Sequence, residues 1–239
     1  MKRVYDLWFS LGANCSAAHN LDIRRLRPFA LPLDWTYIVD EQPIRWLCQA
    51  VDNDFENFCQ WENLEEITLG HPEYNSFHQK HRKYIDKYTG FRFVNHFPRS
   101  MPEYESWSYG YQNLRRRISR LFASFEHYNR FLLVLGTRVH ISSSCLQDLR
   151  LRLMTKYPGK VFDIEGLEFL SDECRNSVST EQGIIMHHCH RDWNAYDTEQ
   201  TNWEWRFLDD IKSTIKPKKH QLSFHCWPHV KCVVKFHKT

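Results

Sequence analysis

The sequence predicts an α/β fold: a mainly parallel central sheet between layers of helices, a three-layer sandwich, with a β-hairpin at the C-terminus. Three observations predict it. Short apolar runs alternate along the chain with amphipathic segments, the pattern of βαβ units. The run at 131–135 (Phe-Leu-Leu-Val-Leu) is continuously apolar, as in a strand buried on both faces. The 239 residues are enough to bury a core, and we expect one domain over 1–239.

Strands are predicted where β-favouring residues run between residues that stop a strand. They lie at 4–11, 91–97, 130–135, 160–164 and 183–188. Gly12, Pro98 and Gly136 end the first three of them. Two further strands, 222–227 and 230–237, flank Pro228 and His229 and form the C-terminal hairpin.

Helices are predicted where apolar residues recur every three or four positions. They lie at 16–26, 43–50, 104–125, 142–157 and 202–215. Pro43 suits the first turn of the second helix, because the amide hydrogen that proline lacks has no partner there. Ser142 offers an N-cap to the fourth helix, and Pro158 and Gly159 end it. The segment 55–88 shows neither period, and we expect it to be an irregular cover over the core.

Glycine is scarce, and its scarcity excludes two kinds of nucleotide site. Only 8 of the 239 residues are glycine, about half of the ordinary share of ~7%. Neither Gly-x-Gly-x-x-Gly nor Gly-x-x-x-x-Gly-Lys occurs, so the sequence predicts neither a dinucleotide-binding turn nor a P-loop.

Charge is unevenly spread along the chain. The formal net charge is +3, but residues 211–239 contain seven lysines and no acidic residue. We interpret 211–239, the end of the last helix and the hairpin, as a basic appendage that binds anions or forms a solvated face. The rest of the chain has 25 basic against 29 acidic residues and no recognition motif, so we expect no nucleic-acid partner.

The sequence predicts a cytoplasmic protein without a signal peptide or a transmembrane segment. The apolar stretch after Met1-Lys2-Arg3 has only about nine residues. No run approaches the ~20 apolar residues of a membrane helix. The eight cysteines lack Cys-x-x-Cys spacing, and we interpret them as free thiols, one of which is a candidate nucleophile.

Cys15 is the thiol best placed for chemistry. Gly12, Ala13 and Asn14 lead from the first strand into the first helix, so Cys15 is expected at a helix N-terminus. Unpaired N–H groups and the helix dipole lower the pKa of a thiol there. The same N–H groups and Asn14 would hold an oxyanion, and a histidine from another strand would serve as base. The alternative is a buried, inert cysteine.

Two stretches of the sequence resemble the opening of a known family. Residues 10–15 (Ser-Leu-Gly-Ala-Asn-Cys) and 26–35 (Leu-Arg-x-x-Ala-x-Pro-Leu-Asp-Trp) resemble a bacterial family assigned as papain-like cysteine peptidases, often encoded near surface-polysaccharide genes. The motif at 93–97 (Phe-x-Asn-His-Phe) and the arginine-rich helix are similar to the same family. The likeness covers roughly 5–138. A more distant likeness is to capsule-biosynthesis acetyltransferases, which carry a Gly-Asn-Cys turn and use coenzyme A.

The resemblance implies Cys15 as the nucleophile and His96 as its base. Asp34, in the Pro-x-Asp-Trp stretch, would orient His96 or shape the pocket. In the family an Asp commonly follows the histidine, whereas Phe97 stands there in this chain. The acidic partner of His96 is therefore open.

Arginines on the long helix and after the buried strand are candidates for binding an anionic substrate. Arg116 and Arg120 share a helix face and fit either a carboxylate or phosphate clamp or a solvated surface. The candidate substrate-binding residues are Trp35, Asn95, Arg116, Arg120 and Arg138.

A histidine-rich run at 187–190 completes the candidate site. On a strand His188 and His190 share one face, and because two ligands do not make a zinc site we predict no metal. His190 and Asp192 are candidates for the third member of a catalytic triad. Four segments follow strand ends and are expected to meet at one carboxyl edge: 12–15, 95–96, 136–138 and 187–190.

Two hypotheses for function follow. The first is a cysteine-dependent hydrolase or acyltransferase of surface-polysaccharide metabolism that needs no cofactor or uses coenzyme A as acyl donor. The basic tail and Arg138 suit the phosphates of coenzyme A or an anionic glycan. The second is a non-catalytic carbohydrate- or phosphate-binding protein of the same fold. The expected substrate is a small molecule, a glycan or a peptide.

Overall fold

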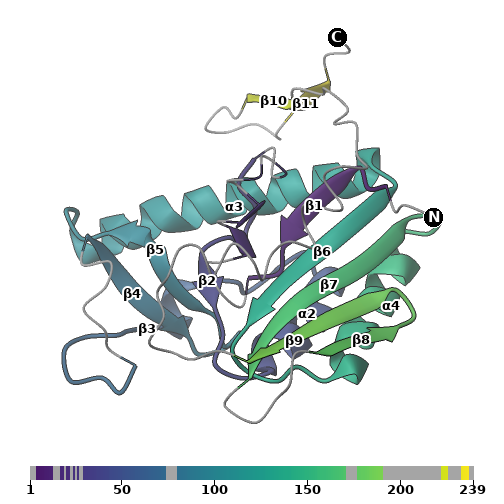
Figure 1. The fold of residues 1–239 in the computed structure, drawn as a ribbon. Coiled ribbons are helices and arrows are strands. Elements are labelled where there is room, and N and C mark those ends of the chain that lie inside the picture. Colours follow the sequence, from purple (N-terminus) through teal and green to yellow (C-terminus); the bar gives the residue numbers. More distant parts are fainter. Residues whose placement is uncertain are drawn as a thin grey trace.

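The computed structural model describes residues 4–12, 29–73, 80–170 and 177–190, with shorter stretches at 17–18, 20–21, 24, 26, 222–225 and 233–236. These residues form a five-stranded and a four-stranded sheet, beside the C-terminal hairpin (Figure 1). The five-stranded sheet contains, in spatial order, β1 (Leu7–Ser10), β6 (Arg130–Thr137), β7 (Val161–Leu170), β9 (Ile184–His190) and β8 (Ser177–Glu181).

The five-stranded sheet confirms the predicted mostly parallel core. The pairs β1–β6, β6–β7 and β7–β9 are parallel, and β8 alone pairs antiparallel, on the outside of β9. The apolar run 131–135 lies in β6 and is fully buried, because β1 and β7 flank it and side chains cover both of its faces. Gly136 does not end β6 as predicted, since the strand continues to Thr137.

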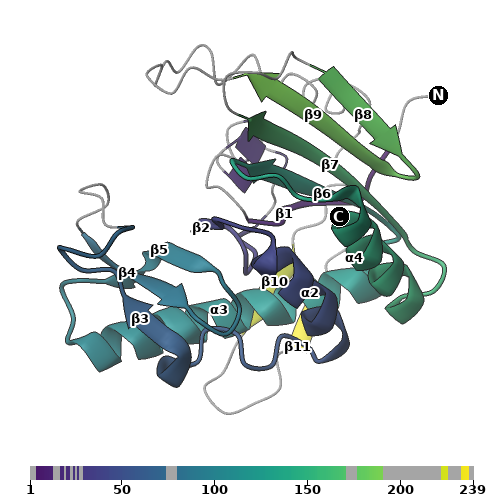
Figure 2. The ribbon, with the colours of Figure 1, turned by 90° about the horizontal axis from the view of Figure 1, so that it is seen from below.

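Three helices cover one face of this sheet (Figure 2). They are α2 (Gln42–Asp52), α3 (Glu103–His127) and α4 (Ser143–Lys156). Two predicted signals for helix starts are confirmed. Pro43 lies in the first turn of α2, and the Ser142 side chain accepts a hydrogen bond from the Cys145 N–H at the start of α4. On the other face, helical Ala17 and Leu21 pack against Leu132 of β6, which completes the three layers.

The prediction of an irregular cover over 55–88 is wrong in part, because this segment supplies two of the four strands of a second sheet. Its order is β2 (Thr36–Tyr37), β5 (Arg92–Pro98), β4 (His81–Asp86) and β3 (Leu64–Glu66), all antiparallel, and a 3-10 turn (Trp61–Asn63) precedes β3. β4 reads His-Arg-Lys-Tyr-Ile-Asp, and a bulge between Arg82 and Tyr84 interrupts its alternation. A strand with one solvated face and a bulge leaves little apolar signal in the sequence.

Gly110 allows α3 to lie directly against β5. A Cβ atom at Gly110 would stand 2.5 Å from the Phe97 ring and 2.9 Å from the His96 carbonyl oxygen, well inside normal contact. Any larger residue there would push the helix from the strand. The glycine thus places the middle of α3 beside His96.

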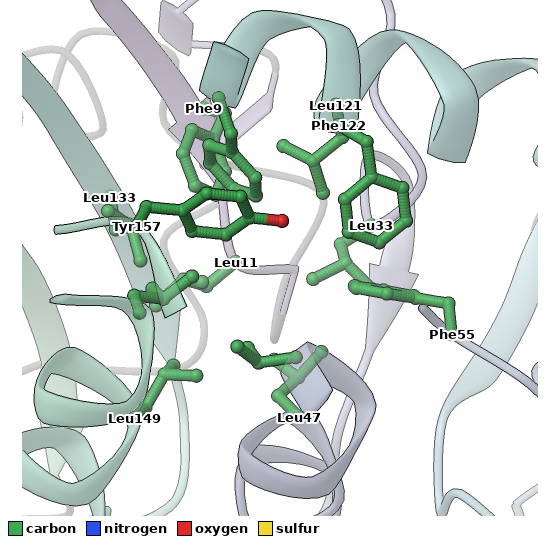
Figure 3. A pocket seen from close by; sticks show the side chains of 13 residues that line it. Phe9, Leu11, Leu33, Leu47, Phe55, Leu121, Phe122, Leu133, Leu149 and Tyr157 are labelled. Atoms are coloured by element: carbon green, nitrogen blue, oxygen red, sulfur yellow. The ribbon is translucent and has the colours of Figure 1, made fainter. Parts of the chain in front are cut away.

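A small cavity lies in the core between β1, α2, α3 and α4 (Figure 3). Its volume is about 20 Å³, room for about one water molecule. Its walls are apolar, and Tyr157, whose hydroxyl pKa is raised by burial, is one of the residues that line it (Figure 3). The size and the lining make it a packing defect rather than a ligand site.

At the C-terminus, β10 (Leu222–His225) and β11 (Val233–Phe236) pair antiparallel, as the predicted hairpin requires. The predicted turn at Pro228 and the predicted helix at 202–215 lie outside the described residues. In the part of the chain that the structure describes, no helix has the length and apolar character needed to cross a membrane.

Candidate active site

His96 is, with Asp34, one of the two buried side chains among the predicted site residues that the structure describes. It lies on β5 and is 6% exposed. The Phe93 ring stands edge-on to it at 5.4 Å between centroids, and the Phe97 ring lies at 6.1 Å. These contacts fix the imidazole ring from the strand side, and α3 closes the other side.

The surroundings of His96 keep its ring neutral. Burial, then the positive charge of Arg117, then His81 lower its pKa from 6.5 to about 3, while the backbone of Asp34 acts in the opposite direction. Arg117 Nη1 stands 3.4 Å from His96 Nε2. Because a guanidinium only donates hydrogen bonds, Nε2 is the acceptor in this contact. His96 Nδ1 is buried and has no hydrogen-bond partner among the described residues.

Asp34 shapes the turn that faces His96. Its side chain is fully buried, and Oδ2 accepts a hydrogen bond of 2.7 Å from the Leu31 N–H. The Thr36 hydroxyl donates to the Leu33 carbonyl at 2.7 Å and tightens the same turn. Trp35, half-buried, adopts a positive φ of 66°, a conformation that a bulky residue rarely takes. The turn at 31–36 is therefore held in one unusual shape.

Gly12 brings the end of β1 to this turn. Its φ is +79°, and a Cβ atom would stand 2.4 Å from Thr36 Oγ1 and 3.1 Å from the Leu33 carbonyl oxygen. The structure therefore joins three predicted elements: the glycine before Cys15, the Asp34 turn, and His96. The predictions for Asn14 and Cys15 lie outside the described residues.

Of the arginines on α3, the one at His96 is not among those selected from the sequence. Arg116 is exposed and donates to Asn113 on its own helix, and Arg120 is half-buried. Arg117 faces His96 instead. The spacing held this signal, because Gly110, Leu114 and Ile118 mark the buried stripe of α3 and residue 117 adjoins it.

The predicted meeting of four segments at one sheet edge is wrong for 95–96, because β5 belongs to the four-stranded sheet. Asn95 is half-buried there, and Arg138 is exposed just after β6. The segments at 12 and 187–190 do share an edge, but β9 is three strands away from β1, about 14 Å at ~4.8 Å per strand. Asp192 and the side chain of His190 lie outside the described residues.

In the described part of the histidine run, two side chains contact buried glutamates on β7. His187 Nε2 lies 3.0 Å from Glu165, and His188 Nδ1 lies 2.7 Å from Glu168. Neither glutamate was predicted as part of a site. In the part of the chain that is described, no three His, Cys, Asp or Glu side chains are grouped to hold a metal ion.

Comparison with protein-family models matches residues 6–156 to the family described as "Putative papain-like cysteine peptidase (DUF1796)". No curated protein and no solved structure matches the chain. The matched segment contains the Gly12 turn, Cys15, Asp34, His96 and Arg117, and it spans more than half of the chain. The chain belongs to this papain-like cysteine peptidase family.

Proposed function

We propose that the protein is a cysteine-dependent hydrolase of amide or ester bonds in which Cys15 is the nucleophile and His96 its acid–base partner. One observation carries the proposal: the buried His96 ring faces the turn that packs on Gly12, three residues before Cys15. Three peptide units span at most ~11 Å, so the thiol is tethered close to this ring. Family membership supports the same pair.

His96 Nδ1 is the nitrogen we assign to the thiol. It has no hydrogen-bond partner in the described part of the chain, while Nε2 faces Arg117. A neutral imidazole can accept a proton, and the low pKa of His96 keeps it neutral at physiological pH. For Nδ1 to accept, the ring proton must lie on Nε2, so Arg117 has to move off Nε2 in the reacting complex. The long 3.4 Å contact is compatible with that movement.

The proposed reaction has two steps. In the first, His96 takes the proton of the Cys15 thiol, the sulfur bonds to the substrate carbonyl carbon, and the leaving amine or alcohol departs with that proton. In the second, water attacks the thioester and restores the thiol. Arg117 adds positive charge near the thiolate, which stabilises it. Asn14 and the N–H groups after Gly12 would hold the oxyanion.

The same nucleophile could transfer an acyl group from coenzyme A to a sugar hydroxyl instead of to water. This transfer needs only a different acceptor for the Cys15 thioester. Trp35 and Asn95, both half-buried, are the residues we would place against the acceptor. Arg138 is exposed at the end of β6 and is the anion-binding candidate for a phosphate-bearing donor.

A stoichiometric thiol-reactive probe followed by intact-mass spectrometry tests the proposal. We expect one label at pH 7, on Cys15, lost in Cys15→Ser and at least tenfold slower in His96→Gln. Cys145→Ser is the matched control, because Cys145 is the competing thiol: it lies in the first turn of α4, and a hydrogen bond with Cys48 lowers its pKa. Labelling of another cysteine first, or an unchanged rate in His96→Gln, would overturn the Cys15–His96 pair.

A second candidate, non-catalytic anion binding, is favoured by one observation. A general base works best with a pKa near the working pH, and the pKa of His96 lies far below it beside the Arg117 cation. Titration with inorganic phosphate followed by calorimetry discriminates the two. Phosphate binding that is lost in Arg117→Met, together with a Cys15 that reacts no faster than a free thiol, would establish binding instead of catalysis.

A further inference from the structure

Three side chains on adjacent strands form a hydrogen-bonded chain that the proposed function does not use. Ser179 Oγ of β8 lies 2.9 Å from His188 Nε2 of β9. His188 Nδ1 lies 2.7 Å from Glu168 Oε2 of β7. The order is hydroxyl, imidazole, carboxylate, the order of a serine-nucleophile triad, with the carboxylate on Nδ1 and the hydroxyl on Nε2.

The buried carboxylate decides which nitrogen of His188 carries the proton. The Glu168 side chain is 1% exposed, and its other oxygen accepts from the Ile141 N–H and from His140 Nδ1, each at 3.0 Å. An ionised carboxylate only accepts, so His188 Nδ1 is the donor and Nε2 the acceptor. The Ser179 hydroxyl must therefore donate to Nε2, the direction that a general base requires.

The topology explains why the three side chains meet. Glu168 and His188 are directly paired across β7 and β9, and Ser179 stands diagonal to His188 across β9 and β8. Ser179 is exposed, while Glu168 is buried and accepts from Ile141 in the loop before α4. Within the described residues β8 is the outer strand of its sheet, so its outward N–H groups are backbone donors open to a ligand. The hydroxyl is thus accessible, His188 is half-buried, and the carboxylate behind it is closed to solvent.

These residues also lie apart from the Cys15–His96 pair. β9 is three strands from β1, and Glu168, Ser179 and His188 all follow the segment matched by the family model, which ends at 156. A purely structural role, tying the outer strand to β9, would need only a serine–histidine contact. It would not need a buried carboxylate that fixes the tautomer.

We propose that Ser179, His188 and Glu168 form a second nucleophilic site, which takes small carboxylic esters. His188 Nε2 accepts the Ser179 proton as Oγ bonds to the ester carbonyl carbon. The C–O bond to the alcohol breaks, and the alcohol leaves with the proton from Nε2. Water then releases the acid and restores the hydroxyl. Glu168 stabilises the imidazolium between these transfers, and the outward N–H groups of β8 hold the oxyanion.

The test uses the full chain carrying Cys15→Ala, so that residue 15 offers no nucleophile. A fluorophosphonate probe with peptide mapping identifies the reactive serine, and p-nitrophenyl acetate hydrolysis gives the rate. We expect the label on Ser179 and its loss in Ser179→Ala. His188→Gln should slow labelling about 100-fold, the usual contribution of a general base. Thr180→Ala, the exposed neighbour on the other side of β8, should leave both readings unchanged.

The same experiment can overturn the site. No labelled serine, a label elsewhere, or equal rates in Ser179→Ala and Thr180→Ala would refute it. Ser179 is exposed, so its substitution should leave folding intact, and circular dichroism verifies this. Glu168→Gln serves as a second variant, since it keeps the acceptor for Ile141 while removing the charge. Because residue 15 is substituted in this test, its result bears on the Ser179 site alone and leaves the Cys15–His96 proposal to its own experiment.

Discussion

His96 and His188 are both largely shielded from solvent, yet their charged neighbours have opposite signs. On His96 the neighbour is the Arg117 guanidinium, 3.4 Å from Nε2. On His188 it is the Glu168 carboxylate, 2.7 Å from Nδ1. A nearby cation disfavours an imidazolium, whereas a carboxylate accepting from Nδ1 fixes which ring nitrogen carries the proton. The comparison shows that burial alone does not assign a histidine its role: the four-stranded sheet holds one that stays neutral, and the five-stranded sheet holds one with a fixed tautomer.

The largest expected effect is on stability in acid. The unfolded chain protonates His96 below pH 6.5, whereas the folded chain keeps it neutral down to about 3. Between these values the unfolded state binds more protons, so stability falls as the pH falls. Between pH 7 and 4.5 this one group should remove roughly 3 kcal/mol of the free energy of unfolding. Urea unfolding of wild type and His96→Gln at both pH values measures it.

The informative quantity is the difference between wild type and His96→Gln in how much unfolding free energy each loses on acidification, because the other titratable groups contribute equally to both. At pH 7 the two proteins differ in unfolding free energy only by the packing that the substitution removes. His96→Gln should then lose about 3 kcal/mol less than wild type on acidification. Equal losses would mean that the folded protein protonates His96 and that Arg117 does not oppose it.

The next effect concerns how α3 meets β5. Gly110→Ala puts a methyl group 2.5 Å from the Phe97 ring and 2.9 Å from the His96 carbonyl. Overpacking of this kind destabilises by about 2 kcal/mol, although alanine favours a helix by up to ~1 kcal/mol over glycine. We expect a net loss in urea unfolding and slower labelling of Cys15. Ser119→Ala, on the exposed side of α3, is the control, and a stabilised Gly110→Ala protein would contradict the close helix–strand contact.

The smallest expected effect is that of the Arg117 charge on the pKa of His96. Arg117→Met should raise the pKa of His96 by about one pH unit, because a single charge is removed while burial, the larger cause, stays. The ring resonances of His96 followed by NMR across pH measure this. Arg116→Met removes the same charge from an exposed neighbouring position and should leave the pKa of His96 where it was. Equal responses of the two variants would show a general effect of charge on α3.

The sequence predicted the parallel core well because its signals are local. The apolar run of β6, the serine cap of α4 and Pro43 in α2 each depend on a few neighbouring residues. Strand β7 shows the limit. It was predicted to end at Ile164, but it continues to Leu170, and its Glu165 and Glu168 pair with His187 and His188. A polar pair between two strands cannot be read from either strand alone.

For the candidate site, too, local motifs could be predicted from the sequence and contacts between elements could not. His96 and Asp34 were found through motifs along the chain, and the structure places both at the turn that faces Gly12. Arg117 was missed because its role depends on a glycine in α3 that lets β5 approach. Glu168 was missed because its partners come from β9 and from the loop before α4. The sequence places Arg117 beside the buried stripe of α3 but does not show which side chain it faces, because contacts between elements decide that.

Gly12 connects the two sheets mechanically. The chain before it belongs to the five-stranded sheet, and the Leu33 and Thr36 atoms it touches lead into the four-stranded sheet that holds His96. A small rotation of one sheet against the other would therefore change the separation between the proposed nucleophile and its base.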